Sequence, residues 1–227
     1  MKFPNAANGV KKIFTAEILS LISSVCVFVT IVLMLAALAS TAGAISSDGS
    51  DGAAVGALAS GAGTVVFGIA TVVLAIIAFI LNIVGITKAS KDEESFKMAL
   101  YALIGGIILS VIGSAFTNVN GYVSSIMQAL QVVADLLVLL YVIQGVRYLA
   151  LKLNRPDIDQ KGQNLFKIIF CVLVLQFIAR MVVVIFGGQA ASVTAAVIAL
   201  IAVVLSFVQY ILYLAFLAKA KKMLAEG

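Results

Sequence analysis

The chain has 227 residues, of which 63% are hydrophobic and 11% charged, and its mean hydropathy is +1.19. Soluble domains hold roughly 45 to 50% apolar and about 25% charged residues, so this composition excludes an ordinary water-soluble fold. The sequence has no histidine, which excludes a histidine general base and histidine-ligated metal sites. With so few charges, the net charge of +5 does not indicate nucleic-acid binding, and we expect no nucleic-acid partner.

Six apolar stretches are long enough to cross a bilayer. A hydrocarbon layer of about 30 Å needs roughly 20 helical residues. The stretches cover about residues 17–41, 63–87, 97–117, 122–151, 164–187 and 191–218. The first is longer than the roughly 7 to 15 residues of a signal-peptide core, so we expect it to be retained as a transmembrane helix. The sequence therefore predicts an all-α polytopic bundle of six helices, with residues 1–227 forming a single transmembrane domain.

The segments between these stretches carry turn and loop signals. Residues 40–62 are rich in Gly, Ala and Ser around Asp48 and Asp51, a composition that predicts a flexible outer loop. Residues 88–94 are charged, and Ser90 with Glu93 has the spacing of a capping box. Pro156 predicts the end of the preceding helix within the connection 152–164.

In the predicted topology, nearly all basic residues lie on one side of the membrane. If the N-terminus is cytosolic, 14 of the 15 lysines and arginines lie in cytosolic segments or at the cytosolic ends of spans, and only Arg180 lies in the interior of a span. The positive-inside rule then places both termini in the cytosol. We expect an integral protein of a prokaryotic cytoplasmic (inner) membrane whose cytosolic face attracts anionic lipid headgroups.

The spans also suggest three tandem helical hairpins, over about residues 9–91, 92–161 and 162–227. Odd spans begin with a phenylalanine beside a base, and even spans end at a base; the pairs are Phe14 and Lys88, Phe96 and Arg147, and Phe166 and Lys219. Such units are typical of transporters with parallel repeats. The alternative is that any antiparallel hairpin that obeys the positive-inside rule shows this pattern.

Two opposite charges lie inside the predicted spans, and each requires a partner or a water-filled cavity. Asp135 is 12 residues from Arg147, and Arg180 is 13 residues from Lys167. At 1.5 Å per residue these separations give similar depths of about 18 and 20 Å. Since helices joined by a short connection are neighbours, we expect Asp135 and Arg180 to meet.

Glutamines extend this pair into a predicted polar ladder. Gln128 and Gln131 share a helix face with Asp135, and Gln176 shares one with Arg180. Gln209 on the last span lies at a depth at which it can join them. In one interpretation the ladder lines a solute or ion path. In the other it is a closed ion pair with amide hydrogen bonds that holds helices together.

The sequence favours a small transporter or a channel-like protein. The alternative is a noncatalytic structural or regulatory subunit of a membrane complex, with a second copy or another membrane protein as partner. We expect no enzymatic activity and no cofactor, because the chain lacks a nucleophile with its base, a phosphate-binding glycine loop and a dinucleotide-binding motif.

Overall fold

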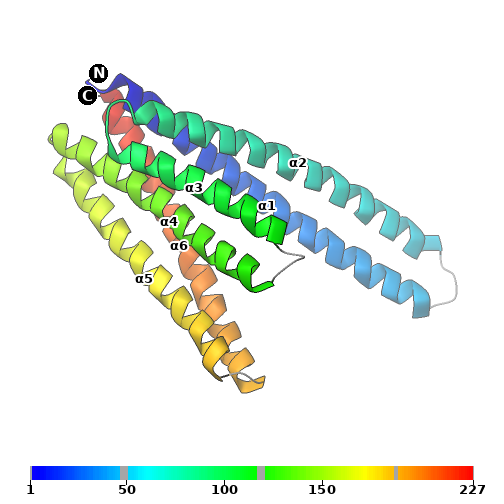
Figure 1. Cartoon of the computed structure of the whole chain (residues 1–227). Coiled ribbons are helices and arrows are strands. Elements are labelled where there is room, and N and C mark those ends of the chain that lie inside the picture. The colour runs from blue at the N-terminus through cyan, green and yellow to red at the C-terminus, as the bar shows by residue number, and fades with distance from the viewer. Residues whose placement is uncertain (1, 47–50, 117–120, 187–188, 227) are drawn as a thin grey trace. The chain divides into compact units, whose positions relative to one another are not determined.

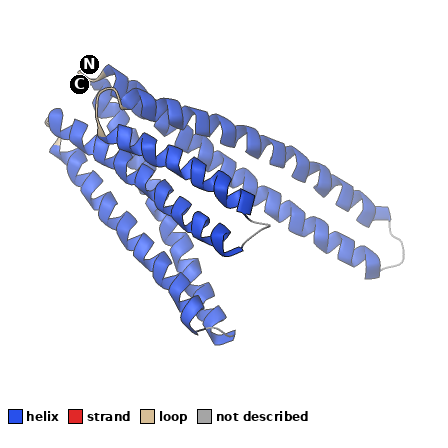
Figure 2. Ribbon diagram, in the orientation of Figure 1, coloured by secondary structure: helices blue, strands red, loops and turns tan. Residues whose placement is uncertain are grey.

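The computed structural model describes the backbone of residues 2–46, 51–116, 121–186 and 189–226, and the side chains of residues 2–35, 65–116, 126, 127, 130–172, 174, 201 and 204–226. These residues form six α-helices and no strand (Figures 1 and 2). The helices are α1 (Pro4–Ser46), α2 (Asp51–Ala89), α3 (Ser95–Phe116), α4 (Gly121–Lys152), α5 (Pro156–Phe186) and α6 (Gln189–Glu226). The predicted all-α class and the number of helices are confirmed.

Five helical stretches among the described residues are long and apolar enough to cross a membrane. They are Pro4–Leu35, Val65–Ala89, Ser95–Phe116, Leu130–Lys152 and Val204–Glu226. Residues 164–186 of the predicted span 164–187 lie on α5, and most side chains of this span are outside the described residues. Large apolar side chains on these stretches are exposed, among them Phe28 at 67% and Val66 at 65%. Apolar surface on this scale is unfavourable in water and favourable in hydrocarbon, so the chain is an integral membrane protein.

The first connection is shorter than the sequence predicts. α1 continues to Ser46 and α2 begins at Asp51, so the backbone is helical over most of residues 40–62. This segment contains many alanines, and alanine has the highest intrinsic helix propensity. In the structure this preference outweighs the glycines on which the loop prediction depended.

The connection between α4 and α5 consists of only three residues. Asn154 adopts a left-handed conformation with φ of 55°. Its N–H donates to the Leu151 carbonyl at 3.0 Å, and the N–H of Arg155 donates to the Ala150 carbonyl at 2.9 Å. This is the hydrogen-bond pattern of a Schellman helix end. α5 then begins directly at Pro156, earlier than predicted, because proline is well suited to the first position of a helix.

The chain divides into two compact units, Met1–Lys11 with Gly85–Gly227, and Lys12–Val84. The second unit corresponds to most of the first predicted hairpin, and in it the Ser23 hydroxyl donates to the Thr71 carbonyl across α1 and α2 at 3.3 Å. In the first unit α3 packs on α4, α4 on α5 and α5 on α6. The three-hairpin repeat and the cytosolic termini stay predictions.

The core of the first unit lies near its charged connections. Its largest fully buried side chains are Val10, Ile86, Phe96, Val142, Ile143, Leu149, Ile158, Ile169, Leu217, Met223 and Leu224. Both chain termini lie at this end in Figure 1. The ring of Phe96 covers Gly145, where an added methyl carbon would lie 2.6 Å from the ring. This core fixes the ends of the helices that carry the charged groups.

Candidate functional site

Asp135 is an exposed residue of α4, on the part of this helix that lies beside Gly106 of α3. A methyl carbon built on Gly106 of α3 would be 3.6 Å from Asp135 Oδ1 and 3.4 Å from the Cβ atom of Ala134. The glycine thus leaves space next to the carboxylate. The sequence indicated α5 as the neighbour of Asp135 but did not indicate this contact with α3.

The predicted partner of Asp135 lies outside the described side chains. The same holds for two ladder members, so Arg180, Gln128 and Gln176 are placed only by their helix backbones. Gln131 and Gln209 are described and are both partly buried. α4 does pack on α5, as the short connection implies. The ion pair and the polar ladder therefore stay predictions.

A polar pocket of about 370 Å³ lies between α1 and α2 within the unit Lys12–Val84. Its polar side chains are Ser20, Ser23, Ser24 and Asn82, and its apolar lining includes Ala78. The Oδ1 atom of Asn82 is buried and accepts no hydrogen bond from the part of the chain that the structure describes. A buried acceptor without a donor lowers the stability of a protein by about 1–3 kcal/mol, so a hydrogen-bond donor that enters this pocket would be stabilised there.

Two of the three serine hydroxyls in this pocket donate to backbone carbonyls. Ser24 donates to the Ser20 carbonyl of its own helix at 2.9 Å, and Ser23 donates to Thr71 on α2. Their protons are engaged, so the hydroxyl oxygens present lone pairs to the pocket. Sequence reasoning missed this site. The signal was present, since Ser20, Ser23 and Ser24 follow helical i, i+3, i+4 spacing within an apolar stretch.

The charged end of the first unit is held by hydrogen bonds between distant segments. The carboxylate of Asp92 accepts from Asn5 Nδ2 at 2.9 Å and from the Ala6 N–H at 2.8 Å. Asp92 therefore caps the N-terminus of α1 from another part of the chain, since the first N–H groups of a helix have no acceptor within it.

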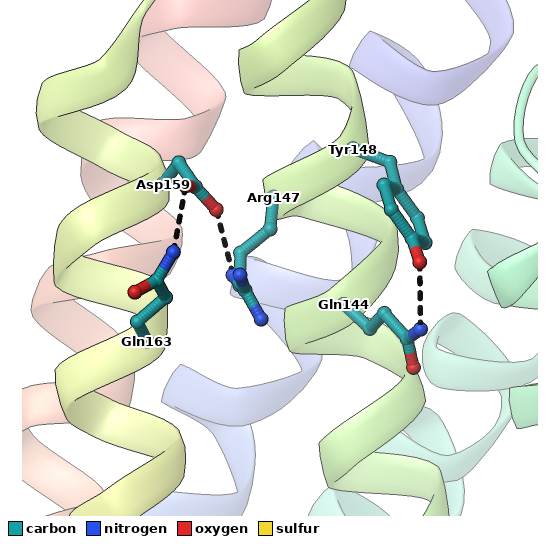
Figure 3. A network of polar contacts seen from close by, with 5 residues as sticks. All are labelled: Gln144, Arg147, Tyr148, Asp159 and Gln163. Atoms are coloured by element: carbon teal, nitrogen blue, oxygen red, sulfur yellow. Dashed lines mark hydrogen bonds and ion pairs between the residues drawn. The ribbon is translucent and has the colours of Figure 1, made fainter.

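Two ion pairs join the ends of the helices. Glu93, whose side chain is 9% exposed, pairs with Lys152 at the end of α4. Arg147 pairs with Asp159 of α5 at 2.7 Å, and Gln163 Nε2 donates to the same carboxylate at 3.0 Å (Figure 3). These contacts tie the segment between α2 and α3 to α4, and α4 to α5.

We expect Asp92→Ala to lower the free energy of unfolding by about 1–2 kcal/mol, because it leaves the N–H of the fully buried Ala6 without an acceptor. In a protein of this size the loss corresponds to a fall in Tm of roughly 2–8 °C. Circular dichroism of the detergent-solubilised protein measures it. The control is Lys91→Ala at an exposed neighbouring position, which should change stability by less than about 0.5 kcal/mol. Equal Tm values for the two variants would contradict the capping role.

The length and composition of the helices define the class of the chain as an integral membrane protein. No protein-family model, no curated protein and no solved structure matches the chain.

Proposed function

We propose that this protein is a small transporter or channel-like protein of the cytoplasmic membrane, with its termini in the cytosol. The observation that carries the proposal is the unpaired Asn82 Oδ1 in the pocket between α1 and α2. Hydrocarbon cannot supply a hydrogen-bond donor, so a polar solute or water is the natural partner of this atom.

The chemistry of the pocket fits a small donor-rich solute. Asn82 Oδ1 and the oxygens of Ser23 and Ser24 offer acceptors, and no charged side chain lines the pocket among the described residues. Asp135, with space beside it at Gly106, adds one carboxylate within an apolar helix of the other unit. The predicted pair of Asp135 with Arg180 is a second, separate candidate for lining a path, within its own unit. The proposal assigns the chain no catalytic step.

The test is flux through purified protein in liposomes, with defined probes. Vesicle shrinkage in glycerol and in urea reports on neutral solutes, and conductance of planar bilayers in KCl reports on ions. We expect at least one probe to cross membranes that contain the wild-type protein faster than it crosses protein-free membranes. Asn82→Leu should reduce that flux roughly fivefold to tenfold, the kinetic equivalent of about one hydrogen bond.

The control is Thr30→Val, which alters a polar residue of α1 that does not line the pocket. The Thr30 hydroxyl is bonded to Cys26 of its own helix, so its loss should leave flux unchanged. Asp135→Asn tests the carboxylate separately. If Asp135→Asn lowers Tm but does not change flux or conductance, the carboxylate serves only to hold helices together. If no probe crosses faster with protein than without it, and a second membrane protein co-purifies in mild detergent, the chain is instead a noncatalytic subunit.

A further inference from the structure

A second pocket, of about 610 Å³, lies where α3 begins and α4 ends. Six of its lining side chains carry polar or charged groups that a ligand can reach: Glu94, Lys97, Tyr101, Tyr141, Gln144 and Tyr148. Gln144 and Tyr148 lie on one face of α4, one turn apart (Figure 3). The pocket lies wholly within the unit that contains residues 85–227.

One negative and one positive side chain remain for a ligand in this pocket. Glu93 also lines it, but its carboxylate is engaged by Lys152. Glu94 and Lys97 are exposed, and neither forms an ion pair within the described part of the chain. They lie one turn apart, since the Lys97 N–H donates to the Glu94 carbonyl at 2.8 Å. The free charges therefore match a ligand with one anionic and one cationic group.

The tyrosines supply both kinds of contact that such a ligand needs. Gln144 Nε2 donates to the Tyr148 hydroxyl oxygen at 3.2 Å, which leaves the hydroxyl proton of Tyr148 for a ligand oxygen. The ring faces of Tyr101 and Tyr141 attract cations, ammonium groups included. Tyrosines are also enriched at the level of lipid headgroups.

We propose that this pocket binds the headgroup of a zwitterionic phospholipid that carries a phosphate and an ammonium group. Lys97 and the Tyr148 hydroxyl hold the phosphate, and Glu94 with the tyrosine rings holds the ammonium. The pocket lies at the charged ends of the candidate spans Ser95–Phe116 and Leu130–Lys152, where headgroups meet a membrane helix. The assignment is independent of the transport proposal, because the pocket contains neither Asn82 nor Asp135.

The experiment measures which lipid stays on the protein. Wild-type protein is reconstituted in nanodiscs of equimolar phosphatidylethanolamine and phosphatidylglycerol, extracted in mild detergent and analysed by native mass spectrometry. We expect phosphatidylethanolamine to be retained about tenfold over phosphatidylglycerol, the effect of one charge-assisted hydrogen bond. Glu94→Gln should remove this preference. Lys97→Gln and Tyr148→Phe should reduce retention of both lipids.

The control is Lys91→Gln. Lys91 is exposed and lies, like Glu94, in the connection between α2 and α3, but it does not line the pocket. This substitution should leave the retained lipids unchanged. Two results would overturn the proposal: a preference of the wild-type protein for phosphatidylglycerol, or an equal loss of lipid in Lys91→Gln and Lys97→Gln. Either would mean that a basic surface attracts anionic lipid without a specific headgroup pocket. Soluble phosphoethanolamine distinguishes the two sources of this headgroup. If it displaces the lipid at an equal concentration, the pocket serves a free metabolite, and the lipid assignment is overturned.

Discussion

Replacing Gly9 with alanine is expected to lower the free energy of unfolding by about 2–3 kcal/mol, near the upper end for an overpacked core. The added carbon would lie 2.5 Å from the Gly85 carbonyl oxygen and 2.7 Å from the N and Cβ atoms of Ala89. None of these atoms belongs to a side chain that can rotate away. Relief of the clash therefore requires α1 and α2 to separate where they contact.

Gly68→Ala is the matched control on α2. No atom of the described residues lies within 4 Å of a carbon added there, and alanine in place of a helical glycine contributes up to about 1 kcal/mol of helix propensity. Thermal unfolding in detergent should give a lower Tm for Gly9→Ala and an equal or higher Tm for Gly68→Ala. Equal Tm values for the two variants would show that the close approach at Gly9 is not structurally required.

Gly145→Ala is expected to cost about 1–3 kcal/mol through the ring of Phe96. The new methyl carbon would lie 2.6–2.9 Å from three ring atoms, and Phe96 is fully buried, so the ring has little space to move. The control is Gly105→Ala on α3, where the added carbon meets no atom of the described side chains or backbone within 4 Å. This variant should be neutral or slightly stabilising.

A double-mutant cycle identifies the cause of the Gly145 effect. Phe96→Leu alone loses ring contacts, but in the Gly145→Ala background it also removes the clash. The two substitutions should therefore cost less together than the sum of their separate effects. Additive losses would mean that α3 and α4 do not pack through this contact.

A helix or a break between helices was predictable from the sequence where one kind of residue dominated the segment. Long apolar runs predicted six helices, and charged or proline-containing segments predicted the breaks. The ends of the helices were less predictable. α5 begins at Pro156 because Asn154 completes a Schellman end within three residues. The segment 40–62 combines good and poor helix formers, and its composition alone favoured a loop.

The contacts between helices were not predictable from a single sequence. Nothing in the spacing of Gly9 indicates that it faces Gly85, and nothing around Asp92 indicates that it caps a helix 86 residues earlier. The polar pocket around Asn82 requires two helix faces to meet in one register. Periodicity predicts which residues share a face, but the rotation of one helix against another depends on the packing of the whole hairpin.

The Asp92 contact implies an order of events during synthesis. The N–H of Ala6 obtains its acceptor from a residue 86 positions later. By the time the ribosome adds Asp92, it has already made all of α1 and α2. The first turn of α1 therefore obtains this acceptor only after all of α1 and α2 has been translated. The cap at the start of α1 is thus one of the contacts that cannot form while the first hairpin is still being translated.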